Sequence, residues 1–197
     1  MTPDSVPRRE NFDEVGDFIA AHETFRDAQA PTGLAVLERA VRLGGDSLRG
    51  IATQVRRIRG REPEDDDWPG RAWMDLQFLI VILWRMRQAG ALALSADTSA
   101  DRLRAALARF DAQVPDLKRM RDVAQHYEEY AVDGRGRRHV RPGRADKIGR
   151  RMLDVGEWNG SRFNCLGGSI DFEVAGRASQ DLFTAIVKAR DEAAGER

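Results

Sequence analysis

The sequence has one cysteine, Cys165, and no excess of charge of either sign. A single cysteine excludes an internal disulfide bond. Because 32 basic residues balance 32 acidic ones, affinity for nucleic acid would have to come from a local basic patch and not from overall charge. The amino terminus lacks the charged and then apolar pattern of a secretory signal. These absences make the cytoplasm the expected compartment.

The chain also lacks the sequence motifs of common cofactor and hydrolase sites. It has no phosphate-binding glycine loop, dinucleotide fingerprint, serine-hydrolase elbow or zinc-ligand spacing, so we expect no cofactor and no metal. Consecutive carboxylates diverge on most backbones, so Asp65, Asp66 and Asp67 are interpreted as a surface loop and not as a metal site. The longest apolar run, 78–84, is far shorter than the roughly 18 residues that span a membrane. We therefore expect no membrane partner.

Apolar residues at helical spacing dominate the rest of the chain and predict a mainly α fold. We expect a disordered leader over 1–10, a helical bundle over 11–134 and a basic loop over 135–151. A small antiparallel β-meander with a C-terminal helix is expected over 152–197 and should pack on the bundle. The predicted helices start near Asn11, Thr32, Asp46, Arg71, Asp97, Val114 and Ser179.

Several boundaries follow from particular residues. Gly44 and Gly45 are expected to end the second helix before Asp46 starts the third. The helix over 71–88 is apolar almost all the way round and should be buried at the centre, with Trp73 and Trp84 as packing residues.

A meander is predicted because three short apolar runs follow residue 152, at 153–158, 163–166 and 170–174. The dipeptides Asn159-Gly160 and Gly167-Gly168 should form its turns, and the last helix should cover 179–194. Cys165 falls in a predicted strand and is expected to be a buried, inert thiol.

The stretch from Val114 to Arg138 combines helical spacing, a histidine and an arginine-rich exit. His126 lies off the apolar stripe of this helix, with Asp122 four residues before it, and Arg121 lies on the other flank. Histidine can act as a general base near neutral pH when a carboxylate orients its ring. Arginine matches phosphate oxygens with a planar set of donors. The apolar stripe consists of Leu117, Met120, Ala124, Tyr127 and Ala131.

The run Arg121, Asp122, Val123, Ala124, Gln125, His126 resembles the motif of the HEPN superfamily, which is an arginine, a polar residue, a few others and a histidine. The resemblance covers about residues 70–134. It implies a metal-independent endoribonuclease in which His126 activates the ribose 2′-hydroxyl and Arg121 binds the scissile phosphate. Asp122 would orient the imidazole.

The resemblance also implies partners and a biological role. Active members pair as homodimers, and many are toxins or act in defence, which would add a cognate inhibitor protein to the partners. Some toxins of the family carry a tyrosine two positions after the histidine. This chain has Glu128 there, so regulation through such a tyrosine is not implied.

The segment 135–151 contains seven arginines and Lys147 against a single aspartate. Arg135, Arg137, Arg138 and Arg141 directly follow the His126 helix and are predicted to bind RNA phosphates. An ordinary solvated loop explains this segment equally well.

Two functions therefore remain open. One is an endoribonuclease with Arg121, Asp122 and His126 in its site. The other is a non-catalytic helical module that binds RNA or a protein, in which the same residues are ordinary surface residues.

Overall fold

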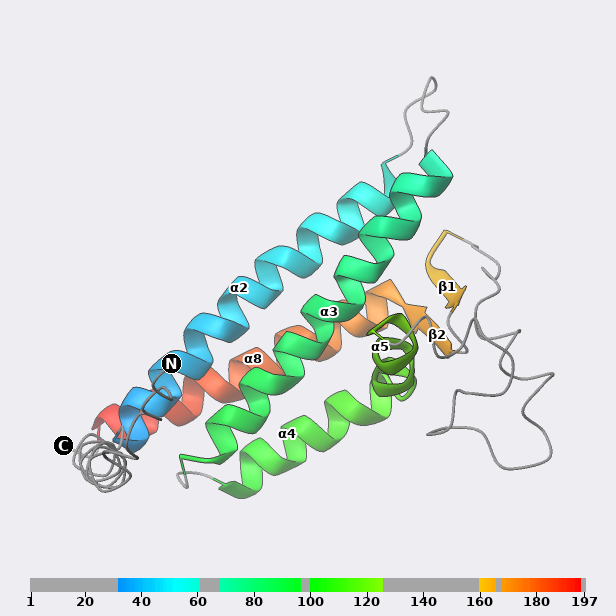
Figure 1. The fold of residues 1–197 in the computed structure, drawn as a ribbon. Helices are drawn as coiled ribbons and strands as arrows, with labels where there is room; N and C mark the ends of the chain where they lie inside the picture. Colours follow the sequence, from blue (N-terminus) through cyan, green and yellow to red (C-terminus); the bar gives the residue numbers. More distant parts are fainter. Residues whose placement is uncertain (1–31, 61–67, 97–99, 126–159, 166–167, 196–197) are drawn as a thin grey trace, which may run out of the picture. The chain divides into compact units, whose positions relative to one another are not determined.

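The computed structural model describes residues 32–60, 68–96, 100–125, 160–165 and 168–195. This part of the chain is mainly helical, with a small antiparallel sheet and a C-terminal helix, so the predicted fold class is confirmed. No helix within these ranges has the length and apolarity needed to cross a membrane. The elements are α2 (Gly33–Arg59), α3 (Trp68–Leu94), α4 (Ala100–Gln113), α5 (Leu117–Gln125), β1 (Arg162–Cys165), β2 (Gly168–Asp171) and α8 (Phe172–Gly195) (Figure 1).

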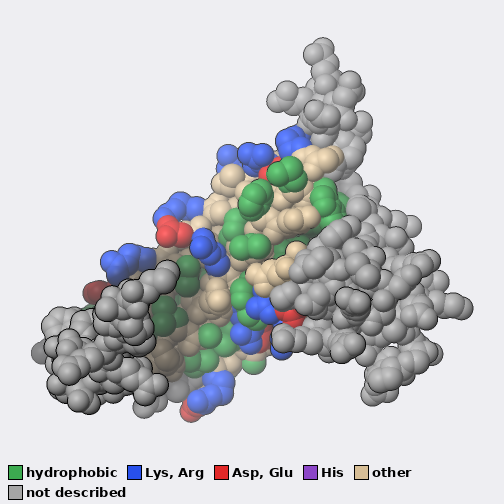
Figure 2. Space-filling view, in the orientation of Figure 1, with side chains coloured by type: hydrophobic (Ala, Val, Ile, Leu, Met, Phe, Trp, Pro, Cys, Tyr) green, Lys and Arg blue, Asp and Glu red, His purple; other side chains and the backbone are tan. Residues whose placement is uncertain are grey.

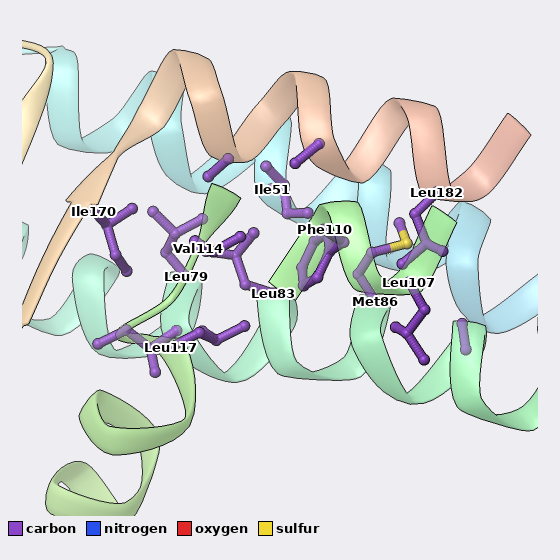
Figure 3. Close-up of a cluster of buried hydrophobic side chains, with 14 of the residues drawn as sticks. Ile51, Leu79, Leu83, Met86, Leu107, Phe110, Val114, Leu117, Ile170 and Leu182 are labelled. Atoms are coloured by element: carbon purple, nitrogen blue, oxygen red, sulfur yellow. The ribbon is translucent and has the colours of Figure 1, made fainter. Parts of the chain in front are cut away.

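Helix α3 is the centre of the bundle, because it contacts α2, α4, α5 and α8 (Figure 1). Helix α8 also packs on α2 and α4, so the C-terminal segment supplies one helix of the bundle. Apolar side chains from all these helices and from β2 form one continuous core. Figure 3 shows part of it, with Ile51, Leu79, Leu83, Met86, Leu107, Phe110, Val114, Leu117, Ile170 and Leu182.

Helices α2 and α3 form an antiparallel pair that is joined near its end by a buried carboxylate. Asp75 is 2% exposed, and its Oδ1 lies 2.9 Å from Nε of Arg57 on α2. Arg71 donates to the backbone oxygens of Arg57 and Gly60, at 3.0 Å each. The arginine thereby satisfies carbonyl groups that the end of α2 leaves without helical partners.

The predicted break at Gly44 and Gly45 is wrong, because α2 is one continuous helix from Gly33 to Arg59. The glycines serve packing instead of ending the helix. A Cβ atom on Gly44 would lie 2.8 Å from Cδ2 of Phe183, so the missing side chain allows α8 to approach α2 closely. A glycine inside a helix costs only about 1 kcal/mol relative to alanine, which tertiary contacts readily offset.

The prediction that the helix over 71–88 is buried at the centre is right for its inner side and wrong for its outer side. Helix α3 is longer than expected, and one side of it is open to solvent. Met74 is 59% exposed, Phe78 53% and Val81 41%, although all three belong to its apolar stretch. The four contacting elements cover only part of the circumference of α3.

Helix α4 ends before Pro115, as predicted, and Leu103, Leu107 and Phe110 point into the core. Helix α5 begins at Leu117, and its side chains Leu117, Met120 and Val123 are buried. This short helix therefore packs against α3 along one face.

Strands β1 and β2 pair antiparallel, with Cys165 opposite Gly168, which confirms the predicted antiparallel pairing of these two runs. Gly168, predicted as a turn residue, belongs to β2, and residue 167 lies outside the described residues. The helix after them begins earlier than predicted, at Phe172 in place of residue 179. Asp171 explains the difference, since its Oδ1 accepts hydrogen bonds from the backbone N–H groups of Glu173 and Val174. This is the geometry of an N-terminal helix cap.

Candidate functional site

Two of the predicted site residues, Arg121 and Asp122, lie in the middle of α5. His126, Arg135, Arg137, Arg138 and Arg141 are outside the described residues, as are the first predicted helix and the run at 153–158. The geometry of Arg121 and Asp122 is therefore the part of the predicted site for which contacts and exposure are known.

The guanidinium of Arg121 stacks on Trp84 of α3, with 3.9 Å between its Cζ atom and the centre of the ring. Such a contact combines the attraction between a cation and the electron-rich face with close packing of two flat groups. The side chain of Arg121 is only 19% exposed. Arg121 is therefore a partly buried residue that joins α5 to α3.

Asp122 pairs with this same arginine. Its Oδ1 accepts a hydrogen bond from Nε of Arg121 at 2.9 Å, and the Nη2 group contacts the same oxygen. We expected Asp122 on a more exposed face, but its side chain is only 17% exposed. Adjacent residues on a helix do not face each other. The side chain of Arg121 is nevertheless long enough to reach the carboxylate of Asp122, the next residue. The predicted contact between Asp122 and His126 lies outside the described part of the chain.

A second arginine, Arg87, approaches the same tryptophan, at 5.2 Å from the ring centre. Its Nε and Nη2 atoms both donate to the carboxylate of Asp111 on α4, at 2.8 Å each. Two parallel hydrogen bonds fix both the position and the plane of this guanidinium. Trp84 thus connects α3 with α5 through Arg121, and Arg87 connects α3 with α4 through Asp111.

A small pocket of about 260 Å³ opens beside this group of residues. Lys118 is the one cation in its lining that has no carboxylate bound to it among the described residues. The volume is slightly below the roughly 300–1,000 Å³ of typical small-molecule sites. The pocket could admit a flat or compact anionic group. Its lining consists of Trp84, Arg87, Asp111, Val114, Pro115, Leu117 and Lys118.

Sequence reasoning placed Trp84 in the core and did not identify Arg87 or Asp111 as neighbours of the site. The spacing of Trp84 and Arg87, three residues apart on a helix, was an available signal that they share a face. Asp111 could not be paired with Arg87 from the sequence, because the contact joins residues 24 positions apart on two different helices.

The arginines in the second half of α2, Arg49, Arg56, Arg57 and Arg59, are exposed. Several of them are neutralised locally: Arg49 pairs with Asp46, Arg57 with Asp75 and Arg59 with Glu173. These pairs reduce the net positive charge of this part of the helix. Arg42 and Arg56 make no ion pair with another residue of the described ranges.

A scan against models of protein families, a search of curated proteins and a search of solved structures each found no match. The residues of the chain itself are therefore the basis for assigning a function.

Proposed function

We propose that this protein is a metal-independent endoribonuclease of the HEPN type. The observation that supports the proposal is the fixed orientation of Arg121, which stacks on Trp84 and donates to Asp122. A guanidinium that packing and a carboxylate already orient loses little conformational freedom when it binds a phosphate. In the sequence, this arginine lies five positions before His126.

In the proposed reaction, the imidazole of His126 takes the proton of the ribose 2′-hydroxyl. The 2′-oxygen attacks the adjacent phosphorus, and the bond from phosphorus to the 5′-oxygen breaks. The 5′-oxygen leaves with a proton taken from solvent, so the products are a 2′,3′-cyclic phosphate and a 5′-hydroxyl. Arg121 stabilises the extra negative charge on the phosphate oxygens in the transition state.

This scheme requires two copies of the chain. Five residues correspond to about 140° around a straight helix, so a helix that continued to residue 126 would not bring Arg121 and His126 of one copy together. A two-fold axis close to α5 would place the arginine of one copy near the histidine of the other. In the proposed dimer, Arg135, Arg137, Arg138 and Arg141 bind flanking phosphates, which gives an affinity that falls as salt is raised.

The test is incubation of purified protein with end-labelled single-stranded and structured RNA in the presence of a metal chelator. His126→Ala should slow cleavage by about 10²–10⁴-fold, the usual contribution of a general base. Arg121→Lys, which keeps the charge and loses the planar donors, should slow it by about 10²–10³-fold.

Arg109→Ala is the matched control, because Arg109 is an exposed arginine on α4 that does not line the pocket beside Trp84. Its cleavage rate should equal that of the wild type. Thermal unfolding of each variant separates loss of activity from loss of structure. Cleavage that requires a divalent metal, or that His126→Ala retains in full, contradicts the proposal.

A non-catalytic interaction module is the second candidate, and the exposed apolar side chains of α3 are the observation that favours it. Exposed apolar patches of this kind often mark surfaces for protein partners. RNA binding or partner binding without cleavage, equal in wild type and His126→Ala, would select this second function.

A further inference from the structure

Met74, Phe78 and Val81 form an exposed apolar strip on α3, which we call the α3 stripe. Their exposed fractions are 59%, 53% and 41%, and they are the exposed large hydrophobic side chains of the described part of the chain. Steps of four and three residues place them on one side of the helix. In Figure 2, hydrophobic side chains gather on this face, with Lys and Arg side chains along its left edge.

Neighbouring helices occupy both flanks of the stripe. On one side, Ile82 of α3 lies close to Gly50 of α2, and Asp75 pairs with Arg57. On the other side, Trp84 contacts Arg121 of α5. Because these contacts use the flanks of α3, the stripe itself faces outward between them. A helix laid along α3 could therefore cover the stripe without displacing any of these contacts.

The charge around the stripe is positive in the part of the chain that the structure describes. Arg57 and Arg71 lie beside its amino-terminal half, with side chains 54% and 31% exposed, and Arg85 lies one turn beyond Val81. The acid among them, Asp75, has a side chain that is only 3% exposed. A partner therefore meets an apolar strip beside basic groups.

A second copy of this chain fits the stripe poorly. A two-fold antiparallel packing of two α3 helices centred on Phe78 would put Arg85 of one copy opposite Arg71 of the other, since each lies seven residues from the centre. Two like charges facing each other oppose such a contact. The dimer of the proposed endoribonuclease would pair close to α5, on a different surface.

Other classes of ligand also fit less well than a helix. The stripe covers seven residue steps, or about 10 Å of helix. Helices that lie on membranes usually present a much longer apolar face. Single-stranded RNA needs flat groups for stacking, and of the three side chains only Phe78 is aromatic.

We propose that the α3 stripe binds an amphipathic helix of another protein, with apolar residues at positions i, i+3 or i+4, and i+7 and with Asp or Glu beside them. The apolar residues cover Met74, Phe78 and Val81, and the acidic ones face Arg57, Arg71 and Arg85. Two turns of partner helix match the length of the stripe, in the way that groove-binding helices use a few anchor residues. This surface is independent of the proposed nuclease site.

The test is selection of binders to the full chain from a displayed library of helix-forming peptides of about 18 residues. The selected peptides should be enriched in acidic residues beside an apolar stripe. A synthesised binder should lose at least tenfold in affinity towards Phe78→Ser and towards Arg85→Glu, and binding should weaken as salt is raised. A version of the peptide with lysine in place of each acid should bind at least tenfold more weakly.

Arg109→Glu on α4 is the control for charge and should bind like the wild type. Because Phe78 is exposed, Phe78→Ser should keep its unfolding temperature, which unfolding of each variant checks. The proposal fails if no peptide is recovered, if the recovered peptides lack acidic residues, or if Phe78→Ser binds them unchanged. It also fails if Phe78→Ser abolishes self-association, binding to anionic vesicles or binding to single-stranded RNA.

Discussion

The inner and outer faces of α3 have similar composition and opposite environments. Leu76, Leu79 and Leu83 on the inner face are at most 1% exposed, whereas Met74 and Phe78 on the outer face are more than half exposed. An apolar run in the sequence therefore predicts a helix that belongs to the core, but it does not show which sides of that helix are covered by other helices. The difference depends on where α2, α4, α5 and α8 lie around the helix.

The largest effect should come from the inner face. Leu83→Ala removes a fully buried side chain and should lower the free energy of unfolding by about 2–5 kcal/mol. Val81→Ala, two residues away and 41% exposed, should change it by less than about 0.5 kcal/mol. Urea unfolding of both variants measures the contrast, and equal losses would contradict the assignment of the two faces.

The buried carboxylate at the α2–α3 contact should give the next effect. Arg57→Ala leaves Asp75 buried, with Nη1 of Arg71 at 3.8 Å from its Oδ2, and should cost about 2 kcal/mol. Arg57→Ala combined with Asp75→Ala should cost less than the sum of the two single variants, because the double variant leaves no buried charge. A double-mutant cycle by chemical unfolding tests this, and strict additivity would show that the two side chains do not interact.

A pair of glycines should give effects of opposite sign. A Cβ atom on Gly168 would lie 2.5 Å from Cβ of Asp116 and 2.8 Å from Cγ of Met120, so Gly168→Ala should push β2 away from α5 and cost about 1–3 kcal/mol. Gly176 in α8 has open space around its Cβ position, so Gly176→Ala should stabilise the protein by about 0.5–1 kcal/mol. Thermal unfolding should give shifts of opposite sign, and shifts of the same sign would contradict the close approach at Gly168.

The sequence predicted those elements whose signals are local. Pro115 marked the end of α4, and the short apolar runs at 163–166 and 170–174 indicated an antiparallel strand pair. The prediction from sequence failed where contacts between distant residues determine the bounds of a helix. Gly44 was taken for a helix end because its contact with Phe183, 139 residues away, is invisible in the sequence. The cap at Asp171 was a local signal that was missed, since the apolar run appeared to continue through it.

The candidate site could be predicted only in part, for the same reason. Helical spacing placed Arg121 and Asp122 on the helix that the structure contains. It could not show that Arg121 stacks on Trp84, because these two residues are 37 positions apart in the sequence and lie on different helices. The stack changes the description of Arg121 from a free surface cation to an oriented, partly buried one.

The most direct test of the proposed function is the chemical identity of the RNA ends after incubation with the protein in excess chelator. The proposal predicts fragments that end in a 2′,3′-cyclic phosphate with the wild type, and intact RNA with His126→Ala over the same time. Intact RNA with both proteins, or fragments with 3′-hydroxyl ends, would contradict it.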